Sequence, residues 1–259
     1  MRYRDELPGK TVSVTRDVVY STAQDGVANN LALDVYRPTP DSVTKRPAIV
    51  VVHGGGFKEG DKTRAKAVAL ATAFAKRGYV AASINYRLLN DTEPIEVAAV
   101  AAQHDAQAAI RFLRKRATTY GIDSERVAIT GTSAGAGTAL LVAVNAEDPG
   151  SSGSPLYSSA VRASMPISGA IGPNQRPAFR EVLDQEDAPT LLFYGTEDTL
   201  VTPDNVKATA AEMNEFGNVA FLQPVEGGHV PFTPEAQHLY YTQGVYFLYK
   251  YLDLANAAQ

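Results

Sequence analysis

The sequence predicts an α/β fold, a mostly parallel sheet of about eight strands flanked by helices. From about Pro47 onward, short runs rich in valine, isoleucine and alanine alternate with longer segments of helical periodicity. This alternation is typical of parallel strands joined by crossover helices. Residues 11–20 and 30–36 come before it, and their β-branched, alternating pattern predicts two antiparallel strands joined by a turn at Asp25-Gly26.

The composition favours one domain over residues 1–259. A chain of this length with 45% hydrophobic residues can bury one large core. Its 24 basic and 28 acidic residues form no long run of one sign, so we expect neither nucleic acid nor an anionic membrane as a partner. There is no cysteine, which excludes disulfides and thiolate metal sites.

The first ten residues alternate charges where a signal peptide has an apolar core, and no apolar stretch approaches the roughly 18 residues of a membrane span. We therefore expect a soluble protein without a membrane span, either cytoplasmic or secreted after removal of a leader. The oligomeric state is not determined by the sequence.

The first crossover unit begins with residues 48–52, a continuously apolar run that predicts a strand covered by helices on both faces. A helix is predicted over 61–77 and a strand over 79–86. The alanine-rich segment 94–120 has apolar residues at helical spacing and predicts an amphipathic helix. Within it, adjacent His104 and Asp105 point about 100° apart, so we expect a structural role for them.

Later elements follow the same alternation. The predicted order is strand 126–130, a helix to residue 145, strand 162–168, strand 190–194, helix 204–216, strand 219–224 and a terminal helix over 234–254. Residues 169–189, with room for one short helix, form the only candidate insertion. So short a segment predicts a minimal lid.

A candidate nucleophile lies in Gly131-Thr132-Ser133-Ala134-Gly135, which matches G-x-S-x-G between a predicted strand and a predicted helix. In this context the serine sits on a sharp turn, and the glycines give the neighbouring backbone room. The alternative is an ordinary small-residue turn, because so short a pattern also arises by chance.

Candidate oxyanion donors follow the 48–52 strand in His53-Gly54-Gly55-Gly56. The amides of Gly55 and Gly56, with that of Ala134, can face a developing oxyanion, while Gly54 is expected to provide the bend. A phosphate-binding loop is the alternative, but the spacings typical of such loops are absent. His53 is expected to hold the loop.

The candidate general base is His229, because it alone among the four histidines lies in a loop after the last predicted strand. Asp198 follows the strand before it and is the candidate orienting acid. Glu197 lies closer to that strand and would have to turn back, and Asp204 is expected to cap the next helix. The order Ser133, Asp198, His229 is that of α/β-hydrolases.

These motifs resemble those of one enzyme family. Residues 53–57 (HGGGF), 85–88 (NYRL) and 131–135 (GTSAG), the Asp198 segment and Gly228-His229 are similar to the hormone-sensitive-lipase-like carboxylesterases and the bacterial carbohydrate acetyl and feruloyl esterases. The resemblance implies an α/β-hydrolase fold and acyl-enzyme hydrolysis without metal or cofactor. The strands predicted at the N-terminus replace the helical cap of hormone-sensitive-lipase-like members.

The expected activity is that of a serine carboxylesterase acting on short-chain acyl esters, on acetyl or feruloyl groups of carbohydrate, or on a polyester. The substrate is then a small-molecule or polymer-borne ester. Phe57, Leu200, Val230 and Phe232 flank the catalytic loops and line either an acyl pocket or the core. An amidase or peptidase with the same triad, and a non-catalytic ligand-binding protein, are the alternatives.

Overall fold

The computed structural model describes residues 3–22, 30–40, 42–88, 94–146 and 152–257. The turn predicted at Asp25-Gly26 lies outside them. The strands are Thr11–Ser21 (β1), Leu31–Thr39 (β2), Arg46–Val52 (β3), Val80–Ile84 (β4), Ile122–Thr132 (β5), Ala163–Ile167 (β6), Thr190–Gly195 (β7) and Ala220–Val225 (β8). The helices are Ala65–Lys76 (α1), Ile95–Lys115 (α2), Ala117–Tyr120 (α3), Ala134–Val144 (α4), Arg176–Val182 (α5), Pro203–Glu215 (α6), Pro234–Leu239 (α7) and Val245–Tyr251 (α8).

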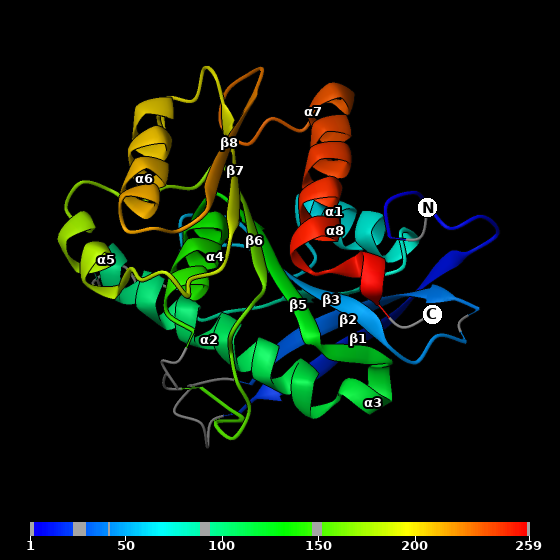
Figure 1. The fold of residues 1–259 in the computed structure, drawn as a ribbon. Helices are drawn as coiled ribbons and strands as arrows, with labels where there is room; N and C mark the ends of the chain where they lie inside the picture. The colour runs from blue at the N-terminus through cyan, green and yellow to red at the C-terminus, as the bar shows by residue number, and fades with distance from the viewer. Residues whose placement is uncertain (1–2, 23–29, 41, 89–93, 147–151, 258–259) are drawn as a thin grey trace.

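All eight strands belong to one twisted sheet with the order β1-β2-β4-β3-β5-β6-β7-β8 (Figure 1). Only β1 with β2 and β2 with β4 pair antiparallel, and every other neighbouring pair is parallel. The predicted fold class is confirmed. The crossover from β3 to β4 and back to β5 places β3 in the middle of the sheet.

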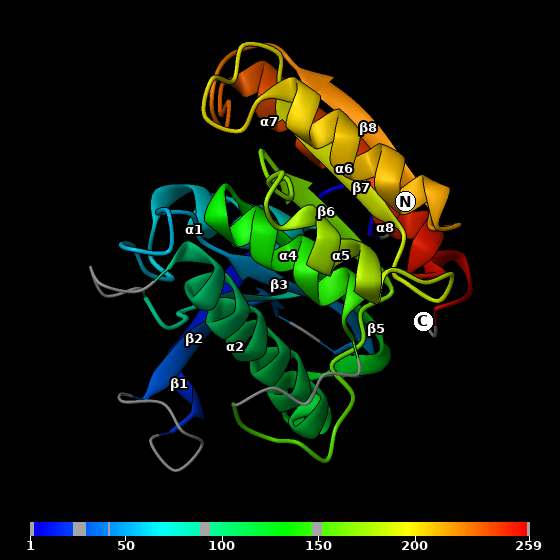
Figure 2. The same cartoon turned by 90° about the vertical axis from the view of Figure 1, so that its left-hand side faces the viewer.

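Helices cover both faces of the sheet. α2, α4 and α6 pack on one face, and α1, α7 and α8 pack on the other (Figure 2). Strand β3 supplies both cores, because successive side chains of a strand point to opposite faces. Val50 and Val52 belong to the core under α2 and α4, whereas Ile49 and Val51 belong to the core under α1.

Two helices differ from the prediction near their ends. Helix α1 begins at Ala65, four residues later than expected, because the carboxylate of Asp61 accepts hydrogen bonds from the backbone amide and hydroxyl of Thr63, both at 2.6 Å. Such local bonds compete with helix formation. The helix expected over 94–120 is interrupted at Arg116, whose φ of −105° and ψ of 18° separate α2 from α3.

The terminal helix is also divided. A π-helical turn, Tyr240–Gly244, lies between α7 and α8, and a short 3-10 helix, Leu254–Asn256, follows. Gly244 packs directly on β6, where a Cβ would lie 2.3 Å from the sulfur of Met165. Only glycine therefore fits where the widened turn meets the sheet.

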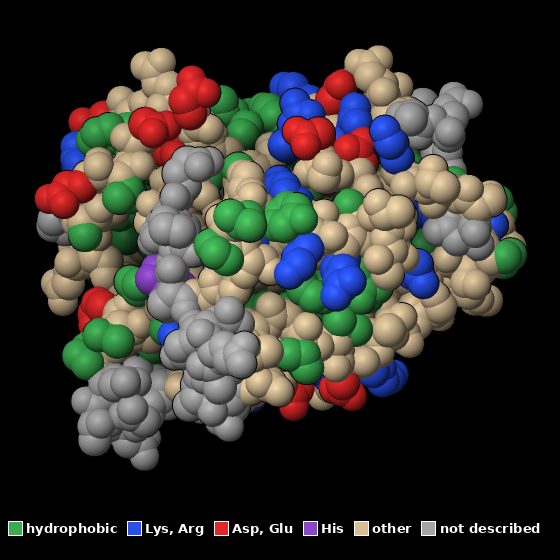
Figure 3. All heavy atoms as spheres, turned by 90° about the horizontal axis from the view of Figure 1, so that it is seen from below, with side chains coloured by type: hydrophobic (Ala, Val, Ile, Leu, Met, Phe, Trp, Pro, Cys, Tyr) green, Lys and Arg blue, Asp and Glu red, His purple; other side chains and the backbone are tan. Residues whose placement is uncertain are grey.

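On the face seen in Figure 3, both Lys and Arg and Asp and Glu side chains occur, so charges of one sign do not cover this face. Within the described ranges, no helix is long and apolar enough to cross a membrane.

Candidate active site

Ser133 occupies a sharp turn between β5 and α4. Its φ of 54° and ψ of −119° lie in a region that side chains disfavour, and its amide donates to the carbonyl of Ile167 at 3.0 Å. A Cβ at Gly131 would lie 2.2 Å from the carbonyl oxygen of Gly135, and one at Gly135 would lie 2.3 Å from that of Val52. Both glycines are therefore required for the backbone to pack this closely around the serine.

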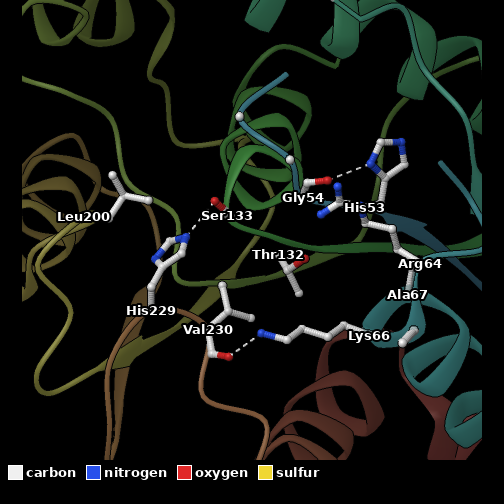
Figure 4. A pocket seen from close by; sticks show the side chains of 13 residues that line it. His53, Gly54, Arg64, Lys66, Ala67, Thr132, Ser133, Leu200, His229 and Val230 are labelled. Carbon is white, nitrogen blue, oxygen red and sulfur yellow. Dashed lines mark hydrogen bonds between the residues drawn. The ribbon is translucent and has the colours of Figure 1, made fainter. Parts of the chain in front are cut away.

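Ser133, His229 and Asp198 form a hydrogen-bonded chain, although they come from three separate strand ends. Figure 4 shows the link between Ser133 and His229. Ser133 Oγ lies 2.8 Å from His229 Nε2, and His229 Nδ1 lies 2.8 Å from Asp198 Oδ2. The other carboxylate oxygen of Asp198 accepts from the amides of Leu200 and Val201, both at 2.9 Å. The carboxylate is buried, so its orientation toward the imidazole is fixed.

The two other acidic residues considered for this place lie elsewhere. Glu197 is exposed. Asp204 lies in the first turn of α6 with Lys207 at 3.8 Å, and the expectation that it caps the helix is wrong. Thr202 is the N-cap residue, and its side chain accepts from the amide of Asn205.

The glycine loop lies directly beside Ser133. Gly55 and Gly56 have φ values of 135° and 62°, which favour glycine. Gly54 allows close approach rather than the expected bend, because a Cβ there would lie 2.8 Å from the carbonyl oxygen of Thr132. Among the described residues, no group accepts a hydrogen bond from the amides of Gly55, Gly56 or Ala134. These amides are available to an incoming oxygen.

Tyr86 supports the loop from behind. Its hydroxyl donates to the carbonyl of His53 at 3.1 Å, and its ring stacks on the imidazole with centroids 4.3 Å apart. His53 Nδ1 donates to the carbonyl of Gly54 at 2.8 Å. Burial lowers the pKa of His53, which favours the neutral imidazole. The structure thus gives His53 contacts that hold the loop.

Asp105 anchors the segment that carries Tyr86. The fully buried carboxylate accepts from the amide of Arg87 at 2.7 Å, pairs with its guanidinium and accepts from Ser152 Oγ at 2.5 Å. These hydrogen bonds with Arg87 and Ser152 give Asp105 a structural role.

A cavity of about 450 Å³ opens beside Ser133 and His229. Leu200 and Val230 line it, as expected for pocket residues. Phe57 and Phe232 are not among the residues that line it. Phe57, with a positive φ of 62°, packs edge-on against Tyr86 in the core, and Phe232 packs on the ring of Tyr240.

Two cationic side chains, Arg64 and Lys66, also line the cavity, and the sequence analysis did not find them. They lie at the start of α1, the helix that follows the glycine loop. None of the described residues between 169 and 189 lines the cavity. Within the described part of the chain, no three His, Asp or Glu side chains are placed to hold a metal ion together.

The fold and the arrangement around Ser133 define the chain as an α/β-hydrolase. The family model named BD-FAE matches residues 33–164, about half of the chain. The chain belongs to this family.

Two of the curated relatives are named as ester hydrolases. LipM of Mycobacterium tuberculosis, a probable carboxylic ester hydrolase, is 25% identical over 266 residues, covering 88% of this chain and 59% of LipM. Esterase LipQ of the same organism is 33% identical over 149 residues, covering 55% of this chain and 32% of LipQ. The chain thus spans between about a third and three fifths of the length of these curated relatives. The resemblance to α/β-hydrolase serine esterases is confirmed.

A solved structure is similar over the whole chain. Esterase Est2 of Thermogutta terrifontis with bound propionate superposes with a TM-score of 0.71 at 25% identity, covering 100% of this chain and 99% of Est2. The likeness supports the same fold from the first strand to the last helix.

Proposed function

We propose that the chain hydrolyses carboxylic esters through an acyl-enzyme on Ser133. The observation that carries this proposal is the hydrogen-bonded chain from Ser133 through His229 to Asp198, beside three amides that donate to no described residue. His229 Nε2 takes the proton of Ser133 Oγ as the oxygen attacks the ester carbonyl carbon. Asp198 holds the imidazole in the tautomer that accepts this proton and stabilises the imidazolium.

The tetrahedral intermediate carries its negative charge on the former carbonyl oxygen. The amides of Gly55, Gly56 and Ala134 are its proposed donors, each worth about 3 kcal/mol of transition-state stabilisation. Collapse of the intermediate breaks the ester C–O bond, and His229 gives its proton to the leaving alcohol. A water molecule then loses a proton to His229 and attacks the acyl carbon. His229 passes this proton to Ser133 Oγ as the bond between Oγ and the acyl carbon breaks and the acid is released.

Short acyl esters are the proposed substrates, carried by small molecules or by a polymer such as carbohydrate or polyester. Two observations support this class: a cavity opens beside Ser133, and none of the described residues of 169–189 covers it as a lid. Est2 with bound propionate is a relative with the same fold.

The test is turnover of p-nitrophenyl butyrate by wild type and Ser133→Ala. We expect the variant to lose at least about 10⁴-fold in kcat, because no other group replaces the nucleophile. A diethyl phosphoryl reagent should lose its leaving group and add the mass of a diethyl phosphoryl group, less the hydroxyl proton, to the peptide holding Ser133 in wild type only. Equal turnover by the two proteins would disprove the proposal, and faster cleavage of a matched butyryl anilide would indicate an amidase.

A further inference from the structure

The cavity beside Ser133 is lined by two cations and, among its described lining residues, by no carboxylate. Arg64 precedes α1, and Lys66 lies in its first turn. Figure 4 shows the Lys66 side chain extended toward Val230 below His229, and the Arg64 guanidinium close to Gly54. Ester hydrolysis as proposed above uses neither side chain.

Lys66 is a partly buried cation that forms no ion pair with any described residue. Its ammonium donates to the carbonyl of Val230 at 2.7 Å and lies 5.8 Å from the ring centroid of Phe232. Because an ammonium has three donors, this bond leaves two for another group. Burial alone lowers the pKa of Lys66, with no carboxylate raising it again. An anion bound in the cavity would stabilise the charged ammonium and offset the free-energy cost of its burial.

Arg64 is expected to attract an anion in the cavity more weakly than Lys66 does. Its guanidinium pairs with Glu59 at 2.7 Å, and both side chains are well exposed. A guanidinium has five donors, so it can hold Glu59 and still face a second anion. Salt and water screen its contribution more than that of Lys66.

We propose that the ester substrate carries a carboxylate, which binds Lys66 with Arg64 as the second cation of the cavity while the scissile carbonyl lies at Ser133. The inference rests on the proposed ester hydrolysis and adds a substrate class to it. The first turn of α1 contributes a further positive potential at the same wall.

Two pairs of synthetic esters test the proposal, each differing by one charge. p-Nitrophenyl hydrogen adipate is compared with its methyl ester, which places the charge on the acyl side. 4-Carboxyphenyl butyrate is compared with 4-carbamoylphenyl butyrate, which places it on the alcohol side. The measured quantity is the ratio of kcat/KM for the charged ester to that for the neutral ester, determined for wild type and variants so that leaving-group reactivity cancels.

We expect Lys66→Met to lower this ratio about tenfold in one pair, the size of one charge-assisted hydrogen bond. Lys66→Arg should retain most of the ratio, and Arg64→Gln should lower it about threefold. Lys76→Met is the matched control, because it removes the same charge from the other end of α1, where Lys76 lies 3.9 Å from Glu6. Its ratio should equal that of wild type.

The outcomes separate the two proposals. A ratio that depends on Lys66 in either ester pair supports the inference and tells which side of the substrate bears the anion. If the neutral esters are hydrolysed and Lys66→Met leaves the ratio unchanged, the inference alone is overturned. The same holds if the variant slows both esters of a pair equally because the Val230 loop has moved. Failure to hydrolyse any ester overturns both proposals.

Discussion

The site joins two halves of the sheet that are built differently. The central half, with Ser133 and the Gly54–Gly56 loop, stands on β5 and β3, which have neighbours on both sides. The other half, with Asp198 and His229, follows β7 and β8, and β8 is the last strand of the sheet. All seven residues of β3 are buried, whereas Phe221 and Leu222 of β8 are 45% and 40% exposed.

This difference in burial accompanies a difference in the contacts that stabilise each half. Four glycines of the central half approach neighbouring carbonyl oxygens so closely that no side chain fits, namely Gly54, Gly55, Gly131 and Gly135. The edge half has one comparable contact, between Gly195 and the Gly228 carbonyl, and otherwise depends on hydrogen bonds. An added methyl group should therefore damage the centre, and a changed polar atom should damage the edge.

The largest expected effect is that of Asp198→Asn in the edge half. The amide would donate to His229 Nδ1 and force the imidazole proton onto Nε2, which could then no longer accept from Ser133. We expect kcat to fall about 10³- to 10⁴-fold. The melting temperature should change little, because the amide oxygen can still accept from Leu200 and Val201. An unchanged kcat would contradict the dependence of the edge half on its hydrogen bonds.

The next effect concerns the central half and uses two glycines of α4. Gly135→Ala places a Cβ 2.3 Å from the carbonyl oxygen of Val52, and we expect a loss of about 3 kcal/mol in the free energy of unfolding. Gly137→Ala is the control, because its Cβ meets nothing within 4 Å. It should gain about 0.5 to 1 kcal/mol. Urea titrations measure both, and equal stabilities would show that close packing does not fix this half.

The smallest effect is a pH dependence at the amino ends of the edge strands. Burial raises the pKa of Asp187 to about 6, while its carboxylate accepts from the amide of Asp184 and the side chain of Asn218. An unfolded aspartate has a pKa of about 3.9, so the folded state binds more protons between these values. Stability from this group is therefore present at low pH and lost as the pH rises from about 4 to 6.

Asp187→Asn tests this sign. The amide oxygen can accept the same hydrogen bonds without ionising, so the variant should be more stable than wild type by about 1 kcal/mol at pH 7.5, after allowance for partial exposure. The advantage should shrink at pH 4.5. Thermal unfolding at both values measures the difference, and an advantage that grows on acidification would reverse the assignment.

The residues now placed in the hydrogen-bonded chain could be predicted because each has a short local signal at a strand end. Ser133 has flanking glycines, and His229 was the only histidine expected in a loop after the last predicted strand. The lining of the cavity could not be predicted in the same way. Which residues face it depends on where α1 begins, and the turn formed by Asp61 and Thr63 delays that start by four residues. For Phe57 the sequence left an acyl pocket and the core open, and the structure places it in the core with a positive φ.

The backbone at Ser133 has a consequence for the history of such chains. Its φ of 54° and ψ of −119° are the angles of the first central residue of a type II′ turn, a position that glycine favours. Holding a serine there costs about 1 to 3 kcal/mol. Folding thus favours glycine at this position, whereas ester hydrolysis needs serine. A protein no longer selected for hydrolysis would become more heat-resistant if glycine replaced the serine.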